Sequence, residues 1–235
     1  MSSAVEIQNL KISFPKKQIL NGVNLSVNKG SFAALIGANG AGKSMLIKAV
    51  CGLQKFTGNI KILGKDLKEA NKNLIGYAPQ NNTADKNSPV SVYQAVSVGR
   101  FAKNGIFKKF GEEDKKIVDN AIRIAQIEYI AASPLGEISG GEAQKVSIAR
   151  VLAQQPEIIL LDEPQANLDP NSQKTFLNFI EKLYLSFKFT CLMVTHDIDM
   201  IPKCCEKVFM LKDGKIVLDT DNKDIKQKAR EYGIY

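Results

Sequence analysis

One stretch of the chain constrains its fold and chemistry more than any other. Residues 37–44 read Gly-Ala-Asn-Gly-Ala-Gly-Lys-Ser, which matches the phosphate-loop pattern G-x-x-x-x-G-K-[ST]. The glycines allow a tight turn in which successive backbone N–H groups point at one anion. Lys43 adds a cation for the terminal phosphates, and the Ser44 hydroxyl is a ligand for Mg²⁺. The stretch therefore predicts a nucleoside triphosphate site.

The neighbouring segments supply the context that this motif requires. Residues 31–36 are a short apolar run typical of a buried strand, and residues 45–50 have the composition of a helix. The order strand, loop, helix places the positive end of the helix dipole at the loop, where it favours phosphate. A glycine-rich turn without a ligand is the structural alternative, and the complete motif in this context favours the nucleotide.

Composition bounds the class of protein. A chain of 235 residues with 44% hydrophobic residues can build a sizeable core as one large domain or two small ones. No signal peptide and no apolar run of about 20 residues is visible, so we expect a cytosolic location. The four cysteines are scattered and His196 is the one histidine, which gives no zinc pattern. The net charge of +8 fits nucleic acid, an anionic membrane or dispersed lysines, and the absence of a dense basic block favours dispersed lysines.

The first part of the chain predicts antiparallel strands. Apolar and polar residues alternate over residues 4–29, with a turn at residues 15–18. Phe14 ends one of these strands, where its ring could stack on a nucleobase or simply belong to the core. Short strands are expected at residues 59–63 and 74–78.

A helical block is expected in the middle of the chain. Gln80 follows the last of the short strands, and on its own it is an ordinary loop residue. A polar segment leads to an amphipathic stretch at residues 92–100 and to a long helix at residues 112–130. We expect this block to be inserted between two halves of an α/β domain.

Two acids form the second strong signal. Residues 157–161 predict a buried parallel strand, and Asp162 and Glu163 follow at its carboxyl end, where α/β sheets bind ligands. Asp162 could contribute to the Mg²⁺ site and Glu163 could polarise a water molecule. His196 also ends a predicted strand, at residues 189–194, and a structural role and a functional role are equally consistent with that position.

Residues 138–146 read Ile-Ser-Gly-Gly-Glu-Ala-Gln-Lys-Val and precede a predicted helix that extends to Gln155. Ser139 and Glu142 have the spacing of a capping box. Two glycines at a helix start can also hold an anion, so capping and anion binding both explain this segment.

Together these motifs resemble the nucleotide-binding subunit of ATP-binding cassette (ABC) transporters along essentially the whole chain. The matching motifs are Walker A at residues 37–44, the Q-loop glutamine Gln80, the signature at residues 138–142, Walker B at residues 159–163, the D-loop at residues 166–169 and the switch histidine His196. Phe14 lies where the family places its base-stacking aromatic residue.

The resemblance implies an α/β P-loop ABC-ATPase fold. It consists of a RecA-like core with an N-terminal antiparallel β-subdomain and an inserted helical subdomain. Residues 1–235 would form a single domain, with residues 1–84 and 133–235 as the catalytic core and residues 85–132 as the helical subdomain.

The resemblance also implies the site and its partners. The cofactors would be ATP and Mg²⁺, with Glu163, His196 and Lys43 as catalytic residues. Ser44 and Gln80 would coordinate Mg²⁺ directly, and Asp162 would lie next to these ligands without coordinating the ion itself. ATP would be bound by Phe14, Gly37, Ala38, Asn39, Gly40, Ala41, Gly42, Lys43, Ser44, Met45, Gln80 and Asp162, and in trans by Ser139, Gly140, Gly141 and Glu142. Two copies would sandwich two ATP molecules at the cytoplasmic face of the cell membrane, joined to membrane permease subunits and a substrate-binding protein, with no nucleic acid.

Three residues depart from the family pattern. Ile138 replaces leucine and Glu142 replaces glutamine in the signature, and both occur in the family. Met45 stands where a second hydroxyl residue is usual, so we expect weaker ATP binding.

The subfamily pattern indicates a cargo. Residues 89–100, 136–142 and 149–154 resemble importers of metal ions (zinc or manganese) and of iron–siderophore complexes. The alternative is a soluble ABC ATPase of iron–sulfur cluster assembly, which also carries Ser-Gly-Gly-Glu. An exporter subunit is a further, less favoured alternative.

Overall fold

A six-stranded sheet forms the centre of the molecule. The computed structural model describes residues 2–15, 17–80, 89–105, 109–166 and 168–231. The strands of this sheet, in spatial order, are β10 (Lys215–Asp221), β9 (Lys207–Lys212), β3 (Phe32–Ile36), β8 (Thr190–Thr195), β7 (Ile158–Asp162) and β6 (Ile75–Ala78). All neighbours are parallel except β10, which pairs antiparallel with β9. The carboxyl ends of the parallel strands therefore meet at one edge.

The three central strands explain why their sequences read as unbroken apolar runs. Every residue of β3, β7 and β8 is buried, because helices or the second sheet cover both faces. One core cluster joins one face of the sheet to the helices that follow β6 and β7, and the other joins the opposite face to the phosphate-loop helix and the N-terminal strands.

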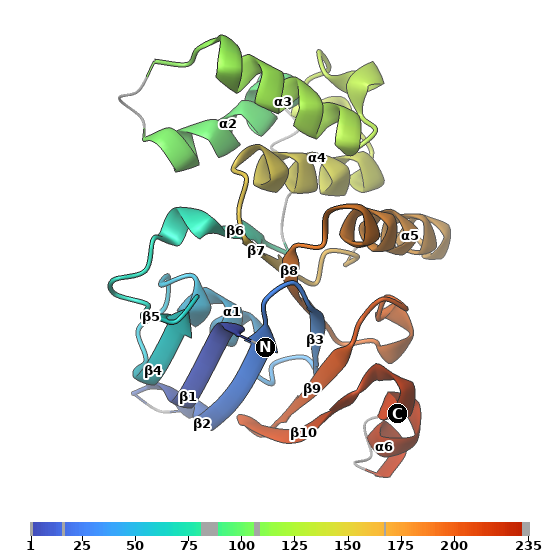
Figure 1. Cartoon of the computed structure of the whole chain (residues 1–235). Helices are drawn as coiled ribbons and strands as arrows, with labels where there is room; N and C mark the ends of the chain where they lie inside the picture. The colour runs from blue at the N-terminus through green and yellow to red at the C-terminus, as the bar shows by residue number, and fades with distance from the viewer. Residues whose placement is uncertain (1, 16, 81–88, 106–108, 167, 232–235) are drawn as a thin grey trace.

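The N-terminal part forms a separate antiparallel sheet, as the alternation predicts. Its strands, in spatial order, are β2 (Lys17–Asn28), β1 (Ser3–Phe14), β4 (Thr57–Ile62) and β5 (Lys65–Asp66). The Asn21 N–H donates to the Gly214 carbonyl oxygen at 2.8 Å, which ties β2 to the β9–β10 turn. This sheet lies beside the lower end of the central sheet and next to α1 (Figure 1).

The helices are α1 (Lys43–Val50), α2 (Val92–Asn104), α3 (Glu112–Ile124), α4 (Gly140–Ala153), α5 (Pro170–Phe187) and α6 (Ile225–Glu231). Short 3-10 helices occur at Lys72–Leu74, Glu128–Ile130, Leu135–Glu137, Ile198–Met200 and Asn222–Asp224. Among the described residues, no helix is long and apolar enough to cross a bilayer.

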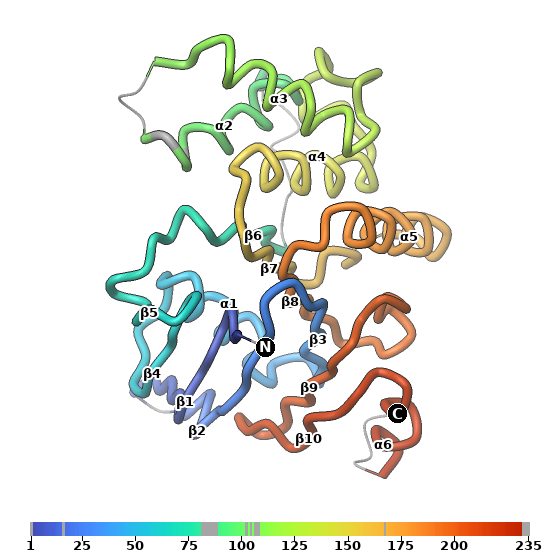
Figure 2. The backbone as a smooth tube through the Cα atoms, in the orientation of Figure 1, coloured from blue at the N-terminus to red at the C-terminus, as the bar shows by residue number. Residues whose placement is uncertain are grey.

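The chain leaves the central sheet after β6, passes through α2 and α3, and returns through α4 to β7 (Figure 2). Both α2 and α3 pack against α4, and a buried ion pair between Arg100 Nε and Asp114 Oδ1 (2.9 Å) joins α2 to α3. This packing is consistent with an inserted helical unit, although its division from the core at residues 85 and 132 stays a prediction. Residues 81–88, which make up most of the polar segment predicted at residues 81–92, lie outside the described residues.

The predicted helix at residues 112–130 is wrong in its length. Its amphipathic pattern continues beyond the point where the helix ends, at Ile124. Gln126 adopts a left-handed φ of 58°, which stops α3 and turns the chain into the 3-10 helix Glu128–Ile130. Ile127, which follows the turn, is fully buried. The apolar periodicity therefore continues because these residues are buried, although the helix has ended.

Candidate functional site

The phosphate loop joins β3 to α1 at the carboxyl edge of the sheet. Gly40 and Gly42 have φ values of 79° and 104°, which side-chain-bearing residues rarely adopt. A Cβ on Gly42 would lie 2.7 Å from Leu20 Cδ2, and one on Gly37 would overlap the Leu211 carbonyl oxygen. Gly42 caps α1 without a side-chain hydrogen bond, so the first N–H groups of α1 remain available to an anion.

Lys43 is folded back over this loop. Its ammonium donates to the carbonyl oxygens of Gly37 (2.8 Å) and Ala38 (3.1 Å) and lies 3.3 Å from Glu163 Oε1. Only 4% of the residue is exposed. The sequence pattern placed this cation at the phosphates, and the structure shows that it also faces the second Walker B acid.

Asp162 lies behind Ser44. Asp162 Oδ1 accepts from Ser44 Oγ at 3.0 Å, and Oδ2 accepts from the Tyr77 hydroxyl at 3.2 Å. Burial raises the pKa of Asp162, and the hydrogen bonds from Ser44 and Tyr77 oppose that shift. Burial and the neighbouring Asp162 together raise the pKa of Tyr77, which keeps that phenol a hydrogen-bond donor.

The oxygen-rich donor set here fits Mg²⁺. The Ser44 hydroxyl and the Gln80 amide oxygen are hard oxygen ligands, the kind that Mg²⁺ prefers, and the Asp162 carboxylate lies next to Ser44. Gln80 Nε2 donates to Glu163 Oε2 at 3.1 Å, which brings the Q-loop residue to the same edge.

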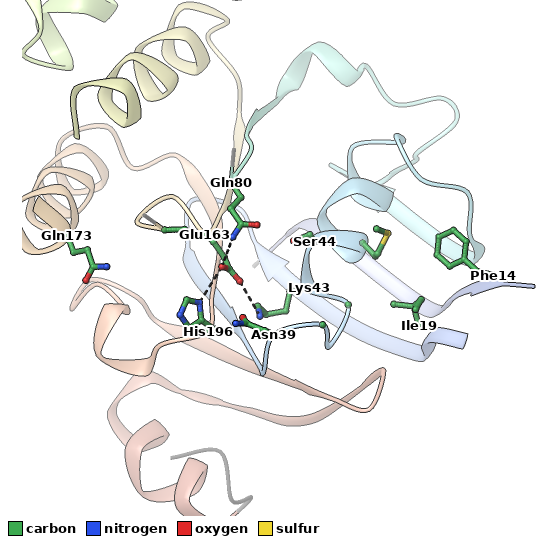
Figure 3. Close-up of a pocket in the computed structure, with 13 residues that line it drawn as sticks. Phe14, Ile19, Asn39, Lys43, Ser44, Gln80, Glu163, Gln173 and His196 are labelled. Atoms are coloured by element: carbon green, nitrogen blue, oxygen red, sulfur yellow. Dashed lines mark hydrogen bonds and ion pairs between the residues drawn. The ribbon is translucent and has the colours of Figure 1, made fainter. Parts of the chain in front are cut away.

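Glu163 is the centre of the site. Its backbone has a left-handed φ of 45°, an uncommon conformation for a residue other than glycine, and its N–H donates to the Val194 carbonyl at 3.0 Å. Its two carboxylate oxygens contact three side chains, those of Lys43, Gln80 and His196 (Figure 3). The strained backbone thus directs the buried Glu163 carboxylate toward Lys43, Gln80 and His196.

His196 follows β8 and lies at the open side of this cluster. Its Nδ1 is 3.3 Å from Glu163 Oε2, and 48% of its side chain is exposed. The structure therefore brings His196 into contact with the candidate water-polarising carboxylate, which the sequence alone left open.

A cavity of about 640 Å³ contains these groups. Its volume lies in the range of small-molecule sites, roughly 300–1,000 Å³. Phe14 is 47% exposed and, with Ile19, forms the apolar side opposite Glu163 and His196 (Figure 3). The candidate residues that line it are Phe14, Asn39, Gly40, Gly42, Lys43, Ser44, Met45, Gln80, Glu163 and His196, while Ala38 and Ala41 line an adjacent cavity of about 700 Å³.

The signature segment is apart from this cavity. Ser139 caps α4, and Glu142 completes the predicted capping box. Residues 139–142 are not among the described residues that line the cavity of their own copy. Their contact with ATP in trans stays a prediction.

The motifs did not indicate four residues of the site, one of which is Ile19, which lines the cavity. Tyr77 binds Asp162, Gln173 of α5 lines the cavity, and buried Gln165 donates to Thr195 Oγ1 at 2.7 Å. Tyr77 becomes identifiable only from the pairing of β6 with β7, which places that strand beside the Walker B acids. No sequence signal indicates Gln165 or Gln173. In the D-loop, Asn167 lies outside the described residues.

Comparison with known proteins gives the family. The ABC transporter family model matches residues 20–166. The manganese transport system ATP-binding protein MntB of Halalkalibacterium halodurans is 36% identical over 90% of this chain and 84% of its own. The zinc uptake system ATP-binding protein ZurA of Listeria innocua is 36% identical over 84% of this chain and 78% of its own.

Solved structures agree with this relationship. CbiO1 from Clostridium perfringens, part of the ABC transporter complex cbiONQ, is 29% identical with a TM-score of 0.83, covering 100% of this chain and 96% of that one. A dimeric ATP-binding cassette in a post-hydrolysis state with ADP and Pi is 27% identical with a TM-score of 0.77, covering 93% of this chain and 98% of that one.

The fold and the site define a nucleotide-binding P-loop ATPase. The chain belongs to the ABC transporter family, and its domain is the ATP-binding, ATP-hydrolysing cassette of that family. The predicted fold class and the resemblance are thereby confirmed, and the comparisons do not favour the iron–sulfur assembly alternative.

Proposed function

We propose that this chain is the ATP-hydrolysing subunit of an importer for a metal ion, manganese or zinc, or for an iron–siderophore complex. Two copies work together with separate membrane permease subunits at the cytoplasmic face, and a substrate-binding protein delivers the cargo. The observation that supports the catalytic part is the convergence of Lys43, Gln80 and His196 on the Glu163 carboxylate.

The ion pair between Lys43 and Glu163 separates when ATP enters. The Lys43 ammonium moves to the terminal phosphate oxygens, and the loop N–H groups bind the remaining phosphate charge. Glu163 is then free to accept a hydrogen bond from the attacking water and to draw off its proton. Water forms the new P–O bond to the γ-phosphorus as the bond to ADP breaks.

Five other residues contribute to the site. His196 donates to the γ-phosphate and so registers its presence, and Phe14 stacks on the base. Ser44 and Gln80 would hold Mg²⁺, with Asp162 next to Ser44; bound there, the ion would neutralise phosphate charge.

Pairing of two copies would complete each site. Ser139, Gly140, Gly141 and Glu142 lie at the start of α4, away from the cavity of their own copy. In the pair they face the ATP of the other copy, so that closing requires ATP and hydrolysis reopens the pair. The dimeric cassette with ADP and Pi that resembles this chain supports such pairing.

The cargo is inferred from relatives. The manganese and zinc transport proteins MntB and ZurA each share 36% identity with this chain, over 90% and 84% of its length. The association of CbiO1 with the cbiONQ complex supports a membrane partner.

Purification from the native cell tests the proposal. The tagged Glu163→Gln variant is solubilised gently with ATP, and co-purifying proteins are identified. A polytopic permease is the expected partner, and a soluble partner alone would contradict the transport function. Uptake of labelled Mn²⁺ and Zn²⁺, and of an iron–siderophore complex, by cells with the wild-type or the Lys43→Ala chain then identifies the cargo, since only wild-type cells should accumulate it.

A further inference from the structure

The start of α4 is held by a carboxylate that accepts three hydrogen bonds. Glu142 Oε2 accepts from the Ser139 N–H at 2.8 Å and from the Ser139 hydroxyl at 2.6 Å. Glu142 Oε1 accepts from the Tyr129 hydroxyl at 2.7 Å. The hydrogen bonds from Ser139, and then that from Tyr129, hold the pKa of Glu142 below its usual range, so the carboxylate is charged at neutral pH.

Tyr129 belongs to a different element from the other two residues. It lies in the 3-10 helix Glu128–Ile130, which follows α3, and the residue is 71% exposed. Packing therefore does little to fix its ring. The bond from its hydroxyl to Glu142 is short and charge-assisted, which makes it the contact that orients this side chain.

The charge on Glu142 creates a problem for a phosphate partner. The family usually has a neutral glutamine at this position, whereas this chain places a carboxylate there. The Ser139 hydroxyl has one hydrogen, and that hydrogen is directed at Glu142 Oε2. To donate to a phosphate, the hydroxyl must release the carboxylate. Glu142 then loses a donor while another anion approaches, which is unfavourable.

We propose that Tyr129 is a positioning residue for the signature segment. Its hydroxyl keeps a hydrogen bond on the Glu142 carboxylate when the Ser139 hydroxyl turns to the γ-phosphate of the other copy, and it thereby favours closing of the pair around ATP. The proposal rests on the proposed pairing of two copies in trans.

The test measures pairing separately from nucleotide binding. In a Glu163→Gln background, which halts hydrolysis, the dimer dissociation constant with ATP is measured by analytical ultracentrifugation. Tyr129→Phe should weaken pairing by about five- to tenfold, because its hydrogen bond stabilises the Glu142 carboxylate more once the Ser139 hydroxyl has turned away than before pairing. ATP binding by the separate copies and the melting temperature should not change. Tyr93→Phe is the matched control. Tyr93 lies in α2 of the same helical block, and its hydroxyl makes no hydrogen bond with any described residue.

A second background distinguishes positioning from a general structural effect. With Glu142→Gln the charge is gone, so Tyr129→Phe should then weaken pairing by less than about twofold. Equal weakening in both backgrounds would overturn the proposal, as would pairing that is indifferent to Tyr129→Phe. Failure of the Glu163→Gln chain to pair at all with ATP would instead remove the proposed pairing, and this role of Tyr129 with it.

Discussion

Lys43 Nζ lies 3.3 Å from Glu163 Oε1, and both side chains are buried. The cation that should bind phosphate and the carboxylate that should activate water therefore neutralise one another in this structure. Breaking one partner of such a pair leaves an uncompensated charge, so each residue depends on the other until ATP supplies a new partner for Lys43.

Glu163→Gln should abolish most hydrolysis while preserving ATP binding. The amide cannot take a proton from water, and loss of a general base commonly reduces turnover by about 10²–10⁴-fold. Lys43, freed from its ion pair, should bind ATP at least as tightly as before. Phosphate release and ATP affinity measure the two effects.

Glu157→Gln is the control. Glu157 is an exposed acid whose Oε2 lies 2.9 Å from Lys29 Nζ, and it does not line the cavity. This substitution should leave turnover unchanged. A Glu163→Gln chain that hydrolysed ATP at the wild-type rate would remove Glu163 from its role.

Asp162→Asn should stabilise the chain at neutral pH and impair Mg²⁺-dependent turnover. Burial raises the pKa of Asp162 in the folded state above its unfolded value, so ionised Asp162 opposes folding. The destabilisation of the wild type by Asp162 is therefore smallest below the ordinary Asp pKa, about 4. The free energy of unfolding then decreases as the pH rises through the raised pKa. We expect Asn to increase the melting temperature at pH 7 by about 2–4 °C, as ~1 kcal/mol would in a chain of this size.

Thermal melts of both chains from pH 4 to pH 8 check this. The difference between them should shrink as the pH falls toward 4. A difference that stayed constant with pH, or a less stable Asn variant at pH 7, would show that burial of the Asp162 charge does not destabilise the folded chain.

Local patterns predicted most of the elements, the phosphate loop and the two Walker B acids, and the resemblance to the family supplied the other candidate site residues. The run at residues 157–161 and the phosphate loop each combine a strand with chemistry at its carboxyl end, and the structure places both at one sheet edge. The α3 end at Ile124 could not be predicted this way, because a left-handed residue, Gln126, ends the helix while burial continues.

Contacts between segments that are distant along the chain could not be predicted from the sequence. Tyr77 reaches Asp162 only because β6 pairs with β7, and Tyr129 reaches Glu142 only because a turn follows α3. Neither tyrosine belongs to a motif. Such residues act by orienting motif residues, so they become visible only when the register and the packing are known.

Gln165→Leu should lower turnover with little effect on ATP affinity. Gln165 is 4% exposed and donates to Thr195, the residue before His196, so it connects the Walker B end to the switch histidine. Its Oε1 has no partner among the described residues, and removing an unsatisfied buried carbonyl offsets the lost hydrogen bond. We expect a decrease in kcat of about threefold to tenfold, equivalent to ~1 kcal/mol, with a nearly unchanged melting temperature.

Thr195→Val removes the same hydrogen bond from the other side, together with the two that Thr195 Oγ1 makes with the Asp197 backbone N–H and carbonyl. It should reduce kcat at least as much as Gln165→Leu, and the double variant should be no worse than Thr195→Val alone. Additive losses would mean that the two side chains act separately.

Met45→Thr should strengthen ATP binding. Met45 lines the cavity in the first turn of α1, and its thioether is a poor hydrogen-bond partner for phosphate. A threonine hydroxyl there can donate to the α-phosphate, and we expect a gain in affinity of up to about tenfold, or ~1.4 kcal/mol. Met45→Val is the matched control, because valine has the shape of threonine without the hydroxyl. Titration with a fluorescent ATP analogue should show a gain for Thr alone; an equal gain for Val would assign the effect to the smaller side chain, and no gain for either would show that Met45 does not limit affinity.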